Sequence, residues 1–231
     1  MAPYTDLTQK FGVEFDFKPF FLIEPIDIKD FRAQRINIAD YTAIVFSSRH
    51  TIDAYFALCE LSRFKVPETM KYFCTTELIA TYLQKHIVYR KRKIFYGDGR
   101  PESIMDLIGP KHREEKFLIA TSDVTNASPL SDLFTKAGLD FTAAVLVRDV
   151  PQDLKSLDLS KYDMAVLYNP FDLKSLLINF PDFKQGDLKF LSYGKGIAKA
   201  LEEASFKVEV QAPTPDAPSV ARALELYLQN A

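Results

Sequence analysis

The 231-residue chain has no tryptophan, only two cysteines and only three histidines. Cys59 and Cys74 lie in no CxxC-like pattern, which excludes a disulfide framework and favours reduced thiols packed in a core. The scattered histidines, His50, His86 and His112, lack the spacing of metal ligands on one helix face. We therefore expect no metal site and a reducing, cytoplasmic environment.

An excess of charge and long apolar runs are missing too. The 29 basic and 31 acidic residues leave a net charge of −2, whereas nucleic-acid-binding proteins usually show a basic surplus. The longest apolar runs reach about seven residues, far short of the roughly 20 that a transmembrane helix needs. The opening MAPYTDLTQK has no signal-peptide order. The composition indicates an ordinary globular protein with neither a nucleic-acid nor a membrane partner.

One strand–turn–helix pattern occurs twice. Tyr41–Phe56 (YTAIVFSSRHTIDAYF) and Tyr162–Leu177 (YDMAVLYNPFDLKSLL) can be aligned without a gap. Each contains an unbroken apolar run, Ile44–Phe46 or Ala165–Leu167, typical of a strand that is covered on both faces. A polar turn and apolar residues at helical spacing follow each run.

A second pair of segments follows in the same order. Met70–Leu83 matches Leu188–Leu201, and both predict a strand that leads through a polar turn into a helix. A further strand is expected after each helix, at His86–Tyr89 and at Lys207–Val210.

The third pair is Ala2–Phe15 and Ser128–Phe141. Both predict a helix with proline in its first turn, glycine at its end (Gly12 or Gly138) and a strand beyond. Any βα protein can contain one pair of similar segments, but three matched pairs in the same order favour an internal duplication.

This alternation of strands and helices predicts an α/β fold of two similar flavodoxin-like parallel-sheet domains. The repeat is circularly shifted, so we expect one domain to be inserted in the other. The predicted boundaries are 1–20 plus 149–231 for the discontinuous domain and 25–146 for the inserted domain. Two paired hinge strands are expected at about 20–26 and 144–150.

The second copy of the opening segment is preceded by an expected strand, Phe117–Ala120, and by a polar loop, Thr121–Ala127, whereas only Met1 precedes the first copy. The internal symmetry therefore predicts that the first domain lacks a strand. A shortened gene product is the favoured explanation, and a domain with a thinner sheet is the alternative.

Ligands of doubly wound sheets bind at the carboxyl ends of the strands. Hydroxyl groups and free N–H groups at helix starts there bind anions. The candidate binding residues are Ser47, Ser48, Arg49, Thr75, Thr76, Ser122, Asn169, Gly194, Lys195 and Gly196. The hydroxyl residues can equally be N-caps, and the glycine segment, which matches no phosphate-loop pattern, can equally be a tight turn. Two facing domains are expected to bring these arrays together around a cleft.

Several of these stretches resemble one family. The segments IVFSSRHTIDA (Ile44–Ala54), VLYNPFDLKSL (Val166–Leu176), Ser192–Leu224 and the strand AVLVRDV are together similar to the uroporphyrinogen-III synthase family, in the form found in Bacteroidetes-type bacteria. The resemblance covers nearly the whole chain and depends on the order and spacing of the motifs.

The resemblance implies a monomeric hydro-lyase that cyclises hydroxymethylbilane, a linear tetrapyrrole with many carboxylates. The reaction expels the terminal hydroxyl as water and inverts ring D through a spiro intermediate, without a metal or an organic cofactor. The alternative is a diverged relative, weakly active or inactive, that binds a tetrapyrrole or another polyanion.

Departures from the family pattern concern the expected cleft. Val147 stands where the family commonly has a tyrosine that is a candidate for assisting hydroxyl loss, and Gly196 stands where it usually has threonine. Tyr168, at the end of an expected strand, is the candidate acid in this chain. Its alternative role is that of an aromatic packed at the edge of the cleft.

Overall fold

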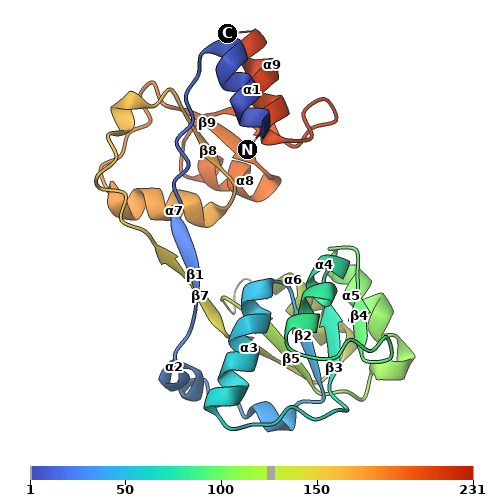
Figure 1. Ribbon diagram of the computed structural model, residues 1–231. Coiled ribbons are helices and arrows are strands. Elements are labelled where there is room, and N and C mark those ends of the chain that lie inside the picture. The colour runs from blue at the N-terminus through green and yellow to red at the C-terminus, as the bar shows by residue number, and fades with distance from the viewer. Residues whose placement is uncertain (1, 124–127, 231) are drawn as a thin grey trace. The chain divides into compact units, whose positions relative to one another are not determined.

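A computed structural model describes residues 2–123 and 128–230 of the chain (Figure 1). The helices are α1 (Ala2–Phe11), α2 (Ile28–Ala33), α3 (Arg49–Leu61), α4 (Glu77–Tyr82), α5 (Pro101–Ile108), α6 (Ser128–Ala137), α7 (Pro170–Asn179), α8 (Lys195–Glu203) and α9 (Val220–Gln229). The strands are β1 (Phe21–Pro25), β2 (Ala43–Phe46), β3 (Lys71–Cys74), β4 (Ile94–Tyr96), β5 (Phe117–Thr121), β6 (Phe141–Val145), β7 (Val147–Pro151), β8 (Met164–Leu167), β9 (Lys189–Tyr193) and β10 (Val208–Ala212). None of the helices within the described ranges has the length and apolar character needed to cross a membrane.

The chain divides into two compact units. Unit 1 comprises Met1–Leu22 and Val150–Ala231, and unit 2 is Ile23–Asp149. The chain leaves unit 1 through β1 and returns through β7, and these two strands pair with each other. Each unit contains one parallel sheet. The predicted α/β fold with two parallel sheets, one unit being inserted in the other, is therefore confirmed.

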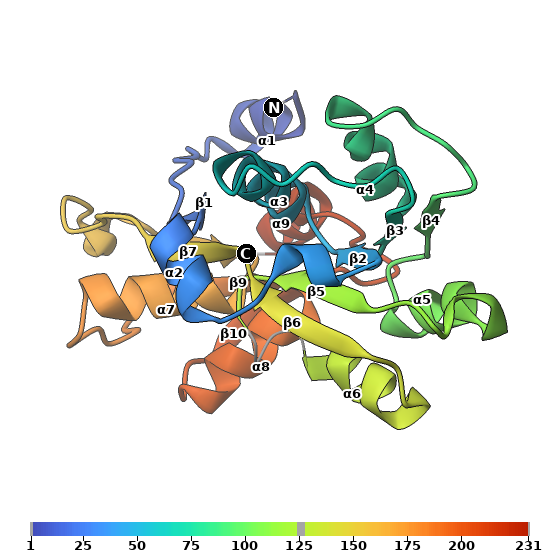
Figure 2. The same cartoon turned by 90° about the horizontal axis from the view of Figure 1, so that it is seen from below.

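The sheet of unit 2 has the order β4-β3-β2-β5-β6. Counted along the chain from β5, this is the 2-1-3-4-5 order of flavodoxin-like sheets, with the chain circularly shifted. Helices α3 and α4 cover one face, while α5 and α6 cover the other (Figure 2). The direction of the connections reverses between β2 and β5, and the carboxyl ends at such a switch point are where ligands bind in this class of sheet.

The sheet of unit 1 has three strands in the order β10-β9-β8. Helices α1 and α9 lie side by side on one face (Figure 1), and α7 and α8 cover the other. Strand β8 corresponds to β2 but pairs only with β9, because no other strand within the described residues lies along its second edge. The unit is thus a shorter version of the same layered design.

The strand expected after the first helix does not form. Helix α1 ends at Phe11 and Gly12 has a φ of +68°, much as Gly138, with a φ of +67°, follows α6. Beyond Gly138 the chain forms β6, which pairs with β5, whereas the residues around Phe15 form no strand. A strand needs a neighbour for its backbone groups, and the described residues of unit 1 form no strand that corresponds to β5.

The expected strand at His86–Tyr89 was also wrong, because β4 forms later, at Ile94–Tyr96. His86 is stacked on Phe56 with ring centroids 4.5 Å apart and contacts the Asp53 carboxylate, which holds this segment against α3. The matched strand in unit 1 forms as β10, close to its expected place. Most of the polar loop expected at Thr121–Ala127 lies outside the described residues.

Candidate functional site

The turn after β2 carries three of the predicted binding residues. Ser48 is the N-cap of α3, and its hydroxyl oxygen accepts a hydrogen bond of 3.1 Å from the Thr51 N–H. Ser47 is exposed, and Arg49 begins the helix with an exposed side chain. The turn therefore places one occupied hydroxyl, one exposed hydroxyl and one cation at the carboxyl end of β2.

The turn after β3 has a similar build. Thr76 is the N-cap of α4 and accepts a hydrogen bond from the Ile79 N–H. The Thr75 carbonyl accepts a 2.8 Å hydrogen bond from the Gly99 N–H, so the loop after β4 is fastened to the loop after β3. The four hydroxyl residues thus divide evenly, Ser48 and Thr76 being caps while Ser47 and Thr75 are not.

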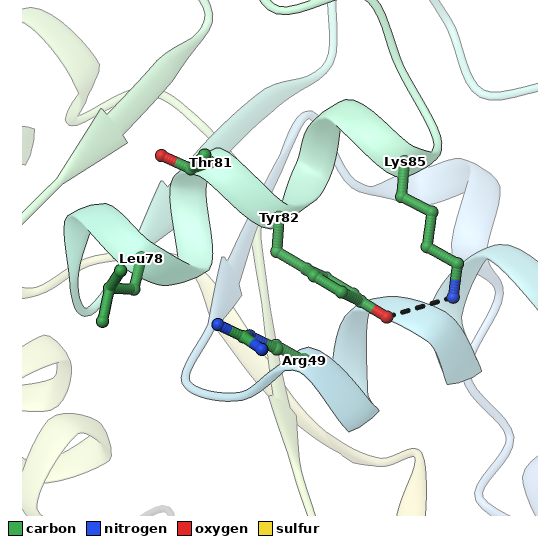
Figure 3. A pocket seen from close by; sticks show the side chains of 5 residues that line it. All are labelled: Arg49, Leu78, Thr81, Tyr82 and Lys85. Atoms are coloured by element: carbon green, nitrogen blue, oxygen red, sulfur yellow. Dashed lines mark hydrogen bonds between the residues drawn. The ribbon is translucent and has the colours of Figure 1, made fainter.

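A hollow of about 360 Å³ opens beside these two turns, between α3 and α4. Its lining residues are Arg49, Leu78, Thr81, Tyr82 and Lys85. Figure 3 shows Arg49 reaching from the start of α3 toward the Tyr82 ring, while Lys85 meets the Tyr82 hydroxyl. Both cationic groups lie 5.3 Å from the centre of the Tyr82 ring, a distance at which cation–π attraction operates.

A carboxylate behind the hollow fixes the positions of its polar groups. Asp53, on α3, accepts hydrogen bonds from the Tyr82 hydroxyl at 2.7 Å and from the Lys85 ammonium at 3.1 Å, and His86 Nε2 lies 2.6 Å from it. Partial burial alone would raise the pKa of Asp53, but hydrogen bonds with His86, Tyr82 and Lys85 outweigh it and lower that pKa. Asp53 therefore stays ionised and forms a hydrogen-bonded ion pair with Lys85.

Arg49 differs from Lys85 because no carboxylate within the described residues forms an ion pair with it. Among the described residues its guanidinium contacts the Tyr82 ring, and it is exposed to solvent. The hollow therefore combines one unneutralised planar cation with an aromatic face and the apolar side chain of Leu78, which is 71% exposed.

Ser122 follows β5 on the other side of the switch point, next to the turn after β2 in the order of the sheet. Its side chain is half-buried, and the neighbouring Thr121 hydroxyl donates a 2.7 Å hydrogen bond to the Asp123 carbonyl. The structure therefore brings the carboxyl ends that carry Ser47 and Ser122 to the same edge of one sheet.

In unit 1 the matching turn already contains a carboxylate. Asn169 is the N-cap of α7, and Asp172 completes a capping box. One Asp172 oxygen accepts hydrogen bonds from the N–H groups of Tyr168 and Asn169, at 2.8 and 2.9 Å. The backbone donors at this strand end are thus occupied by an anion of the protein itself.

Tyr168 lies at the end of β8 with 54% of its surface exposed. Its ring centroid is 5.6 Å from that of Tyr193. Tyr193 is the last residue of β9, so both tyrosines lie at the carboxyl ends of neighbouring strands. Partial burial and a hydrogen bond with Tyr4 raise the pKa of Tyr168. Its hydroxyl therefore remains protonated at neutral pH and can donate a hydrogen bond.

The glycine-rich turn after β9 is a tight turn. Gly194 has a φ of +117°, a conformation that favours glycine, and its N–H donates to the Ala212 carbonyl. Lys195 and Gly196 are exposed on the first turn of α8. A Cβ at Gly196 would meet only the Pro170 Cγ, at 3.8 Å, so the structure can accept a side chain there.

Two features near the strand ends were not predicted from the sequence. The loop after β4 holds Arg100 against Asp98, and this hydrogen-bonded contact lowers the pKa of Asp98 to about 2. The Tyr82–Lys85 half of the hollow was also missed, although the helical spacing of Asp53 from Arg49 indicated that both side chains lie on one face of α3. Val147, the position of the family's tyrosine, is only 2% exposed and packs in the core of unit 2.

The comparisons with solved structures concern the fold. The chain is similar to uroporphyrinogen-III synthetase from Helicobacter pylori 26695, with a TM-score of 0.59 and 20% identity over 92% of this chain and 91% of that one. It is also similar to a mutant uroporphyrinogen III synthase from the extremely thermophilic bacterium Thermus thermophilus, with a TM-score of 0.60 and 15% identity over 99% and 94%. The chain thus has the two-unit α/β architecture of these synthases.

A family model described as uroporphyrinogen-III synthase HemD matches residues 2–222. A search of curated proteins found no match. Because the family model spans almost the whole chain, this protein belongs to the uroporphyrinogen-III synthase family. The family consists of lyases of tetrapyrrole biosynthesis, and its substrate is a small-molecule tetrapyrrole.

Proposed function

We propose that the protein cyclises hydroxymethylbilane to uroporphyrinogen III, with inversion of ring D and loss of water. The observation that carries this proposal is the family match over residues 2–222, which includes both units and both sets of strand ends. The described residues contain no cluster of histidine, cysteine and carboxylate side chains that could hold a metal ion. The residues at the strand ends are the groups proposed to bind the substrate, because ligands of such sheets bind at the carboxyl ends of the strands.

The strand ends of unit 2 are proposed to bind the carboxylates of the substrate. Ser47 and Ser122 lie at the carboxyl ends of β2 and β5, on the two sides of the switch point. Arg49 adds a guanidinium whose planar fork matches a carboxylate. Holding a flexible chain by several of its carboxylates favours the ring-inverting closure by limiting the conformations that the chain can adopt.

In unit 1, Tyr168 is proposed to donate a hydrogen bond to the terminal hydroxyl of the substrate as that hydroxyl leaves. Its raised pKa keeps it protonated at neutral pH, so its proposed role is to stabilise the departing oxygen as a hydrogen-bond donor and not to transfer a proton to it. A Tyr168→Phe variant is expected to lose about a hundredfold in kcat, the low end for removal of one hydrogen-bond donor to a developing negative charge. The matched control is Tyr193→Phe, which removes the neighbouring hydroxyl, bonded to the Pro218 carbonyl.

The direct test is an assay with freshly generated hydroxymethylbilane, followed by separation of the type I and type III isomers. Type III product above the spontaneous type I background supports the proposal. An unchanged isomer ratio at high protein concentration contradicts it.

The two departures from the family pattern have different expected consequences. Gly196→Thr introduces a hydroxyl where the structure has room, so activity is expected to rise. Val147→Tyr, by contrast, inserts a large ring at a buried position and is expected to destabilise unit 2 by overpacking.

We also propose that the enzyme acts as a monomer in the cytoplasm, without a nucleic-acid partner. Both cysteines, Cys59 and Cys74, are free and buried, as expected for a protein that works under reducing conditions. Sedimentation at several protein concentrations tests the oligomeric state, and a mass that rises with concentration would contradict a monomer.

A further inference from the structure

The hollow between α3 and α4 has features of a binding site for an anion on a carbon ring. Its volume of about 360 Å³ lies at the low end of the range for small-molecule pockets, so it suits one ring of a larger ligand. The lining residues that carry charge are both cationic, Arg49 and Lys85. An anionic group is therefore attracted and a cationic one repelled.

The cation with spare bonding capacity is Arg49. Lys85 donates to Asp53 and to the Tyr82 hydroxyl, whereas none of the described carboxylates pairs with Arg49. A guanidinium binds a carboxylate through two parallel hydrogen bonds, which a lysine cannot reproduce. The Tyr82 ring holds the guanidinium from one side, so its N–H edges remain available to a ligand.

The uncharged part of the lining suits a short carbon arm and a ring. The Tyr82 ring supplies an aromatic face, and Leu78 supplies an exposed apolar side chain. The described part of unit 1 has no equivalent, because Pro170 stands at the position matched to Arg49 and Asp172 fills the neighbouring backbone donors.

We propose that this hollow binds one pyrrole ring of the linear tetrapyrrole through the carboxylate of a side arm, Arg49 making the bidentate contact and Tyr82 packing on the arm. The proposal rests on the function proposed above for the substrate class. It assigns to Lys85 a second, longer-range attraction and to Asp53 the task of positioning Lys85 and Tyr82.

Binding is tested without the cyclisation reaction, by titrating the ¹⁵N-labelled full chain with a pyrrole that carries one acetate and one propionate arm. Amide signals of residues 49–53 and 78–86 are expected to shift. The Kd should rise about tenfold in Arg49→Gln, the low end for a hydrogen bond to a charged group because the hollow is open to solvent. The control Arg92→Gln removes an exposed arginine of the same unit and should leave the Kd unchanged.

Two further probes identify the chemistry. The dimethyl ester of the same pyrrole should cause no shifts, and inorganic phosphate should bind more weakly than the diacid. Equal binding of the ester would show that charge is not recognised, and equal binding of phosphate would show that the hollow is a general anion site. Either result overturns the proposal, as does an Arg49→Gln variant that binds like the wild type.

Kinetics separate this proposal from the proposed function. In the isomer assay, Arg49→Gln should raise KM about tenfold and change kcat less than about twofold, since the other carboxylate contacts still restrict the chain and the lost contact is made equally in the ground and transition states. If the wild type is active but Arg49→Gln has an unchanged KM, the binding site proposed in the hollow is wrong, whereas the proposed function stands. Pyrrole binding by a wild-type protein that forms no type III isomer overturns the function but leaves a carboxylate site in the hollow.

Discussion

The two units are built from matched segments, yet their central strands differ in burial. All four residues of β2 are at most 1% exposed, whereas only Leu167 of β8 is buried. Strand β2 has β3 and β5 as neighbours, but among the described strands β8 pairs only with β9. Because the apolar runs of the two strands are similar, the difference shows that burial of a strand depends on its neighbours more than on its own residues.

The same comparison holds for charge at the strand ends. In unit 1 the Asp172 carboxylate occupies the backbone donors after β8. In unit 2 the matched residue is Thr51, whose hydroxyl donates to the Ser48 carbonyl, and the cation Arg49 stands nearby. Of the two matched turns, the one in unit 1 thus has its backbone donors occupied by a carboxylate of the protein, whereas the one in unit 2 carries a cation that pairs with none of the described carboxylates.

The largest expected effect on stability comes from removing a buried aromatic ring. Phe134 of unit 2 is buried, whereas Phe17, in the first segment of unit 1, is exposed. Phe134 is fully buried between Phe117 and Phe141, at 5.1 and 5.4 Å, so Phe134→Ala should cost about 4 kcal/mol of stability. Phe17 is 58% exposed, and Phe17→Ala should cost under about 1 kcal/mol. Urea unfolding followed by amide signals of each unit measures both, and equal costs would contradict the comparison.

The next largest expected effect is a difference in stability cost between two valines at the same position of the repeat. Val45 of β2 is 1% exposed, whereas Val166 of β8 is only half-buried. We expect Val45→Ala to cost about 2.5 kcal/mol, the loss of two buried carbons plus a cavity, and Val166→Ala to cost about 1 kcal/mol. Amide hydrogen exchange in β2 and β8 reports each loss separately. A larger loss for Val166→Ala would show that β8 is buried in solution by something else.

A smaller effect should be equal in the two units, because both helices begin with a side-chain cap at the same position of the repeat. Ser48 caps α3 and Asn169 caps α7. Alanine at either position should cost about 1 kcal/mol. Ser47→Ala is the control, since Ser47 is exposed and caps no helix. Unequal costs would indicate that the unfilled edge of β8 weakens the helix beside it.

Several elements could be predicted from the sequence because their signals are local. The apolar runs at Ile44–Phe46 and Ala165–Leu167 predicted β2 and β8, and Pro129 and Gly138 marked the start and end of α6. A local signal could not show whether the residues around Phe15 form a strand, and the strand expected there is absent. Its formation depends on a partner strand from elsewhere in the chain, and no local pattern reports the absence of a partner.

The candidate site shows the same limit. The strand ends that carry Ser47 and Ser122 could be placed, because parallel strands present their carboxyl ends at one edge of a sheet. The pairing of Arg49 with Tyr82 could not, since it depends on how α3 packs beside α4. His86 was assigned to an expected strand, His86–Tyr89, with the apolar residues that follow it, but its contact with Asp53 keeps it beside α3.

The smallest expected effect depends on pH and on unit 2 alone, because all three histidines lie there. His112 is 4% exposed, packs against the rings of Phe73 and Phe95, and has no partner for Nδ1 among the described residues. Burial lowers the pKa of His112, and the positive charge of Lys71 lowers it further, while Glu115 opposes this and Lys111 adds a smaller decrease.

A lowered pKa means that the unfolded chain binds the proton of His112 more readily than the folded one. Unit 2 should therefore be most stable above the ordinary histidine pKa of about 6.5 and lose stability as the pH falls below it. Amide-resolved unfolding at about pH 7.5 and about pH 5.5 should show unit 2 weakened relative to unit 1. In His112→Leu the same pH step should weaken unit 2 less. If the variant and the wild type respond alike, the pH dependence of unit 2 comes from its other titratable groups and not from the buried imidazole.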